Sequence, residues 1–368
     1  MFVEFSKIKA GWLELEDDLN QSFNNVVNDG FYIGGKFLDK FEKKYSSYCD
    51  STYCVGVSSG LDALILSLKS LNIGQGDEVI VPANTYIASW LAITHCGANP
   101  IPIEPDPISY NIDLKLIENY ITKKTKAIML VYLYGHVVDI ERVKSLAKKF
   151  NLKIIIDAAQ AHGALYNKKQ IGSHGDVVCW SFYPGKNLGA MGDAGAITTN
   201  NSKIALNVRS MRNYGSNKKY VNSLRGFNNR LDSIQAAFLL KKLKKLKKWN
   251  QLRKKIANFY LEELKSLDLI LPSEINYCSH AWHLFVIRLK NRNKFQEFLS
   301  NNQIQTLIHY PIPPHKQKCY GQLNLKRFDL SLTELISKTI ISLPISPHHS
   351  EIEIEYVIEN VKKWFRKR

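Results

Sequence analysis

The chain has 368 residues, 45% of them hydrophobic, which is enough to bury the cores of one large domain and one smaller domain. Its formal net charge of +17 is compatible with a nucleic acid partner or with a phosphate-bearing substrate or cofactor. The start, MFVEFSKIKAGWLELEDD, lacks the basic flank and apolar core of a signal peptide, and no later run reaches the roughly 20 apolar residues that cross a bilayer, so we expect a cytoplasmic protein with no membrane segment.

The six cysteines are scattered along the chain and include no CxxC pair. Neither a zinc site nor a disulfide framework is indicated by this spacing. We therefore expect reduced thiols and no bound metal.

Short β-rich runs alternate with amphipathic helical segments from about residue 52 to residue 200. Such alternation predicts an α/β fold with a mostly parallel sheet between helices on both faces. The expected strands are 53–58, 77–83, 127–135, 153–159, 176–182 and 194–200, and the expected helices between them are 61–71, 85–96 and 140–150.

From residue 230 a single helix, with no Pro or Gly to break it, is expected to run to about residue 265 and to bridge to a second domain. Beyond it, HLFVIRLK, a Pro-rich loop, ISLPIS and a terminal helix predict a smaller α+β unit. The expected division is a large domain over residues 1–240, which includes an N-terminal helical segment, and a bridging helix with a small C-terminal domain over residues 241–368.

The stretch KKLKKLKKW, residues 241–249, is the strongest support for nucleic acid binding. Its leucines and Trp249 recur three to four residues apart, so one stripe is apolar and the lysines line the opposite face of a helix. A solvated helix face is the simpler explanation, and charge alone does not separate the two.

Polar segments follow three of the expected strands, at the carboxyl ends where open α/β sheets bind ligands. They are SSG at 58–60, DAAQAHG at 157–163 and SFYPGK at 181–186. Ser59 and Asp62 have the spacing of a capping box, which would begin a helix. Gly60 would let backbone N–H groups approach an anion at that helix start, so this segment is either a cap alone or a phosphate site.

Asp157 and Lys186 are charged residues in apolar surroundings. Asp157 ends a strand that is otherwise apolar, where a carboxylate needs a cation or good hydrogen-bond donors. Lys186 lies among turn-forming residues after a buried strand, with no carboxylate beside it. Each has an ordinary alternative: a cap or salt bridge for Asp157, and a solvent-facing loop position for Lys186.

Together these groups match the needs of pyridoxal 5′-phosphate (PLP): an amine, an acid for the ring nitrogen and a phosphate cradle. The amine must be partly neutral to react, and a dry pocket poor in carboxylates lowers the pKa of a lysine.

Five motifs occur in order along the chain, namely SSGLDAL, ANTYIAS, DAAQAHGA, SFYPGKNLGAMGDAGA and GFNNRLDSIQAAFL. They resemble the nucleotide-sugar aminotransferases of the DegT/DnrJ/EryC1 family, and residues 31–49 look like that family's opening segment. The resemblance covers nearly the whole chain. It implies the aspartate aminotransferase-like fold (PLP fold type I) and a homodimer with two shared active sites.

Carried over residue by residue, the resemblance assigns Lys186 to the Schiff base with PLP and to proton transfer, and Asp157 to the pyridine nitrogen. It assigns Gln160 to the ring oxygen and Tyr86 to stacking on the ring. The phosphate would be held by Ser59, Gly60, Leu61 and Ser181, with Asn228 reaching in from the other subunit. Tyr86 could instead be a core aromatic, Asn228 a turn residue, and His162 a structural residue.

The loop around Lys186 resembles members that aminate position three of dTDP-linked 3-keto-6-deoxyhexoses, with L-glutamate as the amino donor. Tyr183, His309 and Tyr310 are the candidates for the sugar face. The product, a dTDP-3-amino-3,6-dideoxyhexose, would serve a glycan such as a lipopolysaccharide O-antigen or an S-layer glycan.

Three alternatives remain open. One is amination at position four, and another is a PLP-dependent sugar dehydratase of the same fold, in which the family replaces the lysine with histidine. A third is a nucleic-acid-binding regulatory protein, which would use the basic stretch and would not need Asp157, Gln160 and Lys186 together.

Overall fold

The computed structural model describes residues 1–323 and 325–366 of the chain. Its centre is a seven-stranded sheet with the strand order β1-β9-β8-β5-β4-β2-β3. Only β9 runs antiparallel to its neighbours, so the expected mostly parallel sheet is confirmed. The strands are β1 Tyr53–Val57, β2 Glu78–Pro82, β3 Asn99–Ile103, β4 Thr125–Val131, β5 Lys153–Asp157, β8 Val177–Ser181 and β9 Gly195–Thr199.

All six expected strands are present, and a seventh, β3, whose sequence is NPIPI, was not expected from its sequence. Proline lacks the N–H that a central strand must donate, so a run with two prolines does not suggest a strand. β3 tolerates them because it lies at the edge of the sheet and pairs only with β2. The strand expected over 127–135 also ends early, at Val131, and residues Leu133–Gly135 form a 3-10 turn.

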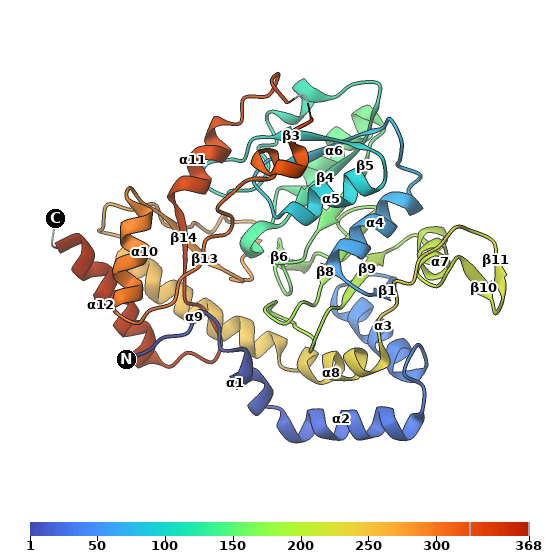
Figure 1. Cartoon of the computed structure of the whole chain (residues 1–368), viewed down its shortest axis with the longest axis horizontal. Helices are drawn as coiled ribbons and strands as arrows, with labels where there is room; N and C mark the ends of the chain where they lie inside the picture. The colour runs from blue at the N-terminus through green and yellow to red at the C-terminus, as the bar shows by residue number, and fades with distance from the viewer. Residues whose placement is uncertain (324, 367–368) are drawn as a thin grey trace.

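Helices cover both faces of the sheet, as expected (Figure 1). Alternate residues of β4 point into two different cores, with Ile128 and Leu130 in one and Ala127 and Met129 in the other. The first core is shared with α3 Lys36–Tyr48, α6 Ile140–Phe150 and α8 Ser233–Leu243, and the second with α4 Gly60–Ser70, α5 Ile87–His95 and α7 Ser202–Met211.

The expected single helix over 230–265 is wrong: α8 ends at Leu243, and α9 Leu246–Leu264 follows after a turn at Lys244 and Lys245. No Pro or Gly marks this break. Leu239 of α8 and Leu246 at the start of α9 pack under the large sheet, whereas Tyr260, later in α9, packs in the C-terminal core. Tertiary packing therefore overrides a uniformly helical local sequence.

The C-terminal core also takes in the start of the chain. Val3 pairs with Ile304 and packs among residues of α9, α10, α12 and the antiparallel pair β13–β14, and the N-terminus lies beside these helices (Figure 1). A division of the chain near residue 240 is our proposal. These elements are α10 Arg292–Asn301, α12 Glu351–Arg366, β13 Phe285–Arg288 and β14 Ile340–Leu343.

Further helices and strands lie outside the central sheet and its covering helices. They are α1 Ile8–Leu13, α2 Glu16–Asp29, α11 Ser331–Thr339, the hairpin β10 Ser216–Lys218 with β11 Val221–Asn222, and a small sheet of β6 Leu165–Tyr166, β7 Lys169–Gln170 and β12 Cys278–Ser279. Among the described residues, none of the helices has the length and apolar content that a bilayer crossing requires.

A buried carboxylate joins the N-terminal helices to the sheet. Glu42 of α3 accepts hydrogen bonds from the N–H of Gly56 at 2.9 Å, from Arg209 at 2.9 Å and from Arg212 at 2.6 Å. Both arginines also donate to backbone carbonyls of β1. One side chain thus holds α3, α7 and β1 together.

Glu42→Ala is expected to lower the free energy of unfolding by about 3–5 kcal/mol, because it leaves two arginines beside a buried strand without their counter-charge. Urea unfolding followed by circular dichroism measures the change. The matched control is Glu141→Ala, which removes an exposed pair with Lys144 and should cost at most about 1 kcal/mol. Equal losses in the two variants would contradict this role for Glu42.

Candidate active site

The strand order brings the three sequence-predicted segments to one edge of the sheet. β5 neighbours β8, with Asp157 opposite Cys179, and β8 neighbours β9, with Ser181 opposite Gly195. Gly195 also lies opposite Val57 at the end of β1. The antiparallel β9 therefore begins where β1 and β8 end, and the loop between β8 and β9 carries Lys186 across this edge.

The start of α4 has the structure of an anion cradle. Ser59 caps the helix: its Oγ accepts from the N–H of Asp62 at 3.1 Å and donates to the Asp62 carboxylate at 2.7 Å, which confirms the helix start that their spacing predicted, although the carboxylate accepts from the Ser59 hydroxyl and not from its backbone N–H. The first-turn N–H groups of Gly60 and Leu61 have no partner within the helix. They form the positive end of the helix dipole, where phosphate groups bind.

Position 60 has room only for glycine, because the start of α4 packs closely against Ser181. A Cβ at position 60 would lie 2.6 Å from the Cβ of Ser181, closer than two carbon atoms can approach. Glycine thus lets the start of α4 reach the end of β8 and brings Ser181 to the same cradle.

Asp157 is nearly fully buried, with 7% of its surface exposed. Its carboxylate accepts from the Ser89 hydroxyl at 2.9 Å and from the N–H of Ala159 at 3.1 Å. Burial raises the pKa of Asp157, while these two hydrogen bonds and the charge of Lys186 act in the opposite direction. No basic side chain lies within 4.0 Å of it among the described residues. It is therefore a carboxyl group held by donors rather than by a salt bridge.

Lys186 is only partly exposed and forms no ion pair or side-chain hydrogen bond with any other described residue. Its backbone N–H donates to the carbonyl of Tyr183 at 2.8 Å, in a tight turn. Burial lowers the pKa of Lys186 to about 8, and the opposing attraction of Asp157 is smaller. The solvent-facing alternative for Lys186 is not supported by this environment.

Several supports of the lysine loop were not found from the sequence. Asn187 donates to Asn250 of α9 at 3.0 Å and to the carbonyl of Ala281 at 2.8 Å. Lys242 of α8 donates to the carbonyl of Gly189 at 2.8 Å. The long helices thus hold the loop in place from one side. The only sequence signal was the position of Asn187 beside Lys186.

Lys242 also corrects the prediction that the lysines of 241–248 line a solvated face. Lys242 is buried, and burial lowers its pKa. Lys241 pairs with Asp18 of α2 at 2.6 Å and Lys245 with Glu14, which follows α1, at 3.4 Å, so the N-terminal segment covers part of this stretch. The apolar stripe therefore does not account for every lysine of this stretch, because Lys242 points inward to the loop that carries Lys186.

Three of the remaining candidates, Gln160, Tyr310 and Tyr86, lie next to one another. Gln160 accepts from the N–H of Tyr134 at 2.6 Å and donates to the hydroxyl of Tyr310 at 2.9 Å, and the ring of Tyr310 lies 5.0 Å from that of Tyr86. Tyr86 is 53% exposed, so it is not a core aromatic. His309, which precedes Tyr310 in the sequence, lies with its Nδ1 2.8 Å from the hydroxyl of Ser342. Tyr183 is exposed in the turn that carries Lys186.

Asn228 is exposed, and the structure does not bring it into contact with the other candidates. Its neighbour Asn229 donates to Asp62 at 2.9 Å, so this segment lies beside the α4 cradle of its own chain. His162 is buried between the rings of Trp180 and Phe182, in agreement with a structural role. Within the described residues, no group of three or more His, Cys, Asp or Glu could hold a metal ion.

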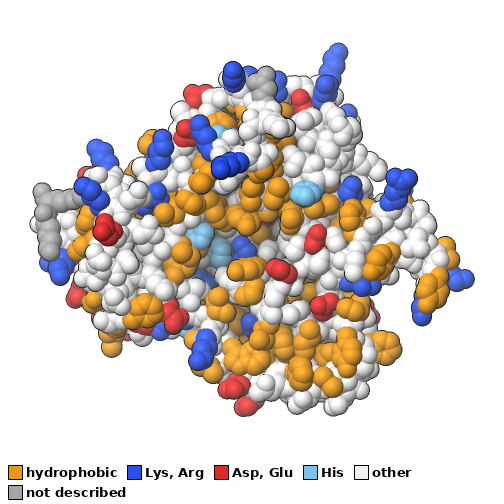
Figure 2. All heavy atoms as spheres, in the orientation of Figure 1, with side chains coloured by type: hydrophobic (Ala, Val, Ile, Leu, Met, Phe, Trp, Pro, Cys, Tyr) orange, Lys and Arg blue, Asp and Glu red, His pale blue; other side chains and the backbone are white. Residues whose placement is uncertain are grey.

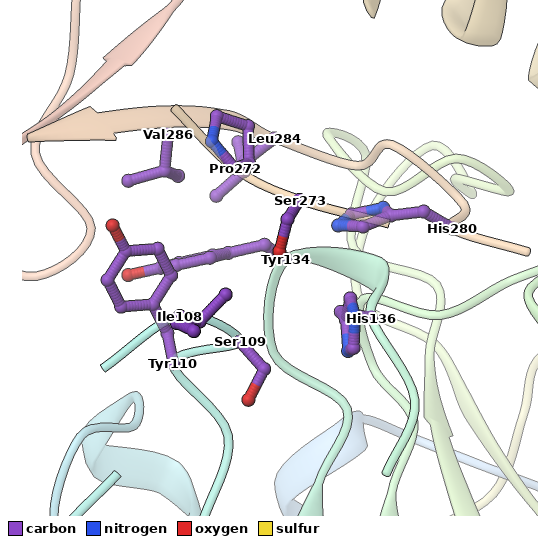
Figure 3. A pocket seen from close by; sticks show the side chains of 10 residues that line it. All are labelled: Ile108, Ser109, Tyr110, Tyr134, His136, Pro272, Ser273, His280, Leu284 and Val286. Carbon is purple, nitrogen blue, oxygen red and sulfur yellow. The ribbon is translucent and has the colours of Figure 1, made fainter. Parts of the chain in front are cut away.

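A second cavity lies apart from the candidate site. Figure 2 shows histidine and basic side chains in a recess that apolar side chains surround. Figure 3 shows the other cavity, between Tyr110, Tyr134 and His136 on one side and Ser273 and His280 on the other. That cavity contains none of the residues at the strand ends.

Because its pKa is about 8, Lys186 should react with amine reagents at lower pH than the exposed lysines in the cofactor-free protein. About one tenth of such amines are neutral at pH 7, against fewer than about one in a thousand for a lysine with a pKa of about 10.4. Competitive labelling across a pH series, read by mass spectrometry, measures this. A labelling midpoint for Lys186 that coincides with those of exposed lysines would rule out the lowered pKa.

Gly60→Ala should weaken PLP binding by about tenfold or more, because its methyl group would force the start of α4 away from Ser181. Gly74→Ala is the control, since a Cβ there would lie 3.4 Å from its nearest neighbour, the carbonyl oxygen of Cys96, at the edge of ordinary contact. Equilibrium dialysis with PLP gives both affinities. Unchanged affinity in Gly60→Ala would show that the close approach is not needed for the cradle.

Comparison with known proteins agrees with this arrangement. The sequence matches the DegT/DnrJ/EryC1/StrS aminotransferase family over residues 14–362. A dTDP-3-amino-3,6-dideoxy-alpha-D-galactopyranose transaminase of Aneurinibacillus thermoaerophilus is 52% identical and covers 98% of this chain and 99% of its own.

Solved structures agree as well. The crystal structure of DesV from S. venezuelae superposes with a TM-score of 0.97 at 41% identity, over 99% of this chain and 98% of its own. NtdA from Bacillus subtilis, solved with the bound cofactor PMP, has a TM-score of 0.94 at 31% identity, over 99% of this chain and 85% of its own. The chain therefore belongs to the DegT/DnrJ/EryC1/StrS aminotransferase family.

Proposed function

We propose that this protein transfers an amino group from L-glutamate to a dTDP-3-keto-6-deoxyhexose, giving a dTDP-3-amino-3,6-dideoxyhexose. It is a PLP-dependent sugar nucleotide aminotransferase. The observation that carries the proposal is Lys186, an amine with a lowered pKa and no ion-pair partner, beside a buried acid and a helix start. The position of the keto group is supported by the name of the Aneurinibacillus relative.

The residues present fit PLP, which when bound supplies an electrophilic carbon and a ring that withdraws electrons from the reacting carbon. Ser59, Gly60, Leu61 and Ser181 would hold its phosphate at the start of α4. Asp157 would keep a proton at the ring nitrogen, a contact that offsets the cost of burying its charge. Tyr86 would cover one face of the ring, and Gln160 would donate to the ring oxygen.

Lys186 is the general acid and base of the mechanism. With a pKa of about 8, a substantial fraction of its amine is neutral near physiological pH, so Nζ can take a proton from the α-carbon of the amino donor. The same group returns a proton to the sugar carbon in the second half of the reaction. Tyr183, which is exposed, and the partly exposed His309 and Tyr310 are proposed to contact the sugar.

The alternatives are less well supported. The dehydratase alternative requires histidine where this chain has Lys186, and amination at position four lacks support from the Aneurinibacillus relative. The nucleic acid alternative loses part of its basis, because Lys242 is buried and Lys241 and Lys245 are paired with carboxylates.

We also propose a homodimer with shared active sites. Five apolar residues of α2 and the segment that follows it are 44–64% exposed, a patch that a monomer rarely leaves open. The hairpin β10–β11 projects from the body of the molecule (Figure 1), and Tyr220 at its tip is 88% exposed. The patch residues are Phe23, Val27, Phe31, Tyr32 and Ile33.

A cytoplasmic location and a role in glycan synthesis, for an O-antigen or an S-layer, are further parts of the proposal. The six cysteines support the location, since none forms a disulfide among the described residues and five are buried as thiols. The glycan role rests on the proposed product being a nucleotide-activated sugar, which is a donor for glycosyl transfer.

The purified holoenzyme should convert a dTDP-3-keto-6-deoxyhexose in the presence of L-glutamate, and NMR of the product should place nitrogen at carbon three. The screen should contain gluco and galacto isomers, 4-keto isomers and UDP-linked analogues. Lys186→Ala, which removes the proton carrier, should be at least about 100-fold slower. Preferred turnover of a 4-keto substrate, or near-parental activity of Lys186→Ala, would overturn the proposal.

Shared active sites predict rescue between inactive variants. If Asn228 acts in the partner's site, a mixture of Lys186→Ala and Asn228→Ala homodimers should recover activity once subunits exchange, because one site in each hybrid carries neither change. Asn228→Ala must itself be impaired, and a tag pull-down must establish exchange. Full exchange without recovery would place each phosphate site within one chain, as the contact between Asn229 and Asp62 would then suggest.

A further inference from the structure

Serine hydroxyls lie around the start of α4, where the PLP phosphate is proposed to bind. Ser58 and Ser59 directly precede this helix. Ser181 ends β8, and a Cβ on Gly60 would lie 3.2 Å from its Oγ. A hydroxyl group carries a single hydrogen atom, and a phosphate group accepts hydrogen bonds. A serine side chain can therefore bind the phosphate only if its hydrogen is not already donated elsewhere.

Asp62, in the first turn of α4, takes the hydrogens of two of these hydroxyls. Its Oδ2 accepts from the Oγ of Ser58 at 2.6 Å and from the Oγ of Ser59 at 2.7 Å. The Oγ of Ser59 also accepts from the N–H of Asp62 at 3.1 Å. An ionised carboxylate can only accept, so both serines must donate to it. While these bonds stand, neither hydroxyl has a hydrogen left for a phosphate.

Ser181 differs from the other two serines. Its Oγ accepts from the N–H of Tyr183 at 3.3 Å, and none of the described residues accepts its hydrogen. That hydrogen can point toward a phosphate beside the first-turn N–H groups of Gly60 and Leu61. Of these three hydroxyls, the one of Ser181 is therefore the available donor.

Asp62 also ties the cradle to a third segment of the chain. Its Oδ1 accepts from the amide of Asn229 at 2.9 Å. Asn229 is held in turn through its backbone N–H, which donates to the carbonyl of Arg212 just after α7 at 2.9 Å. One carboxylate thus links the end of β1, the start of α4 and the segment that carries Asn228.

The charge of Asp62 would by itself be a disadvantage at this place. A carboxylate in the first turn of a helix competes for the positive end of the dipole, and it repels a phosphate nearby. Charge and geometry therefore make opposite predictions for the removal of this side chain. Loss of the charge should strengthen phosphate binding, whereas loss of the hydrogen bonds that shape the cradle should weaken it.

We propose that Asp62 is a positioning residue of the phosphate cradle. By holding the side chains of Ser58, Ser59 and Asn229, it fixes the shape of the cradle. The phosphate is then bound by the N–H groups of the first turn and by the hydroxyl of Ser181, and not by the hydroxyl of Ser59. The inference rests on the proposed placing of the PLP phosphate at this helix start, and it limits any contribution of Ser59 to its backbone.

Asp62→Ala should weaken PLP binding about tenfold, roughly the loss of one hydrogen bond, although it removes a negative charge. Asp62→Asn is equally uncharged but keeps one oxygen that can accept from the hydroxyls, so its affinity should lie between those of Asp62→Ala and the parent. Equilibrium dialysis with PLP measures all three affinities. Binding by Asp62→Ala that is as tight as that of the parent, or tighter, would overturn the inference.

Phosphorus-31 NMR of bound PLP tests which serine touches the phosphate, because the resonance responds to the groups that donate to it. Ser59→Ala should leave the resonance at its parental position, whereas Ser181→Ala should shift it. A shift in Ser59→Ala as large as that in Ser181→Ala would overturn the inference alone. If neither variant shifts the resonance, the phosphate lies elsewhere, and both the inference and the proposed phosphate site fail.

The link to Asn229 is tested by combining variants. Asn229→Ala should weaken PLP binding by less than Asp62→Ala does, and the double variant should bind PLP as Asp62→Ala does, because the bond between the two side chains is already lost. Additive losses would show that Asn229 acts independently of Asp62, against the inference. None of these measurements needs a sugar substrate, so they decide the role of Asp62 even if no keto-sugar nucleotide is accepted and the proposed function fails.

Discussion

The burial of a lysine without a counter-charge is the constraint on which the site depends. Moving an ammonium group out of water favours its neutral form, and here that effect exceeds the attraction of Asp157 and lowers the pKa of Lys186 to about 8. The surroundings of the lysine follow from this constraint. The lysine loop is held through the side chain of Asn187 and the carbonyl of Gly189, and none of the described carboxylates forms an ion pair with the amine.

The strand order converts this local chemistry into a complete site. Because the antiparallel β9 lies between β1 and β8, the helix start after β1 and the lysine loop after β8 meet at one edge. Because position 60 is a glycine, the start of α4 can lie against Ser181 at the end of β8. The acid on β5 then lies one strand away from the loop, near enough to influence the amine electrostatically and too far to form a salt bridge with it.

Much of this arrangement could be predicted from local sequence. The β-rich runs gave six strands of the sheet, the Ser59–Asp62 spacing gave the cap of α4, and the isolation of Asp157 and Lys186 in apolar surroundings marked the chemistry. Each of these signals lies within a few residues. The resemblance to the family's motifs then placed these separate signals in one active site, which their spacing in the sequence alone could not do.

What could not be predicted depends on contacts between distant segments. β3 contains two prolines and is a strand only because of its place at the sheet edge. Ser89 reaches Asp157 across 68 residues, and Lys242, within a run of similar lysines, is distinguished only by the Gly189 carbonyl that it meets. The turn between α8 and α9 has no local marker, because two separate cores impose it.

The pairing of Val3 with Ile304 has a consequence for how the molecule is made. During synthesis, residue 3 leaves the ribosome about 300 residues before its partner, and the C-terminal core in which it packs is not complete until Val361 has followed. The large sheet can form in the meantime, since domains generally fold as units while the chain emerges. The segment around Val3 therefore finds its place only after the residues that complete the C-terminal core have been made.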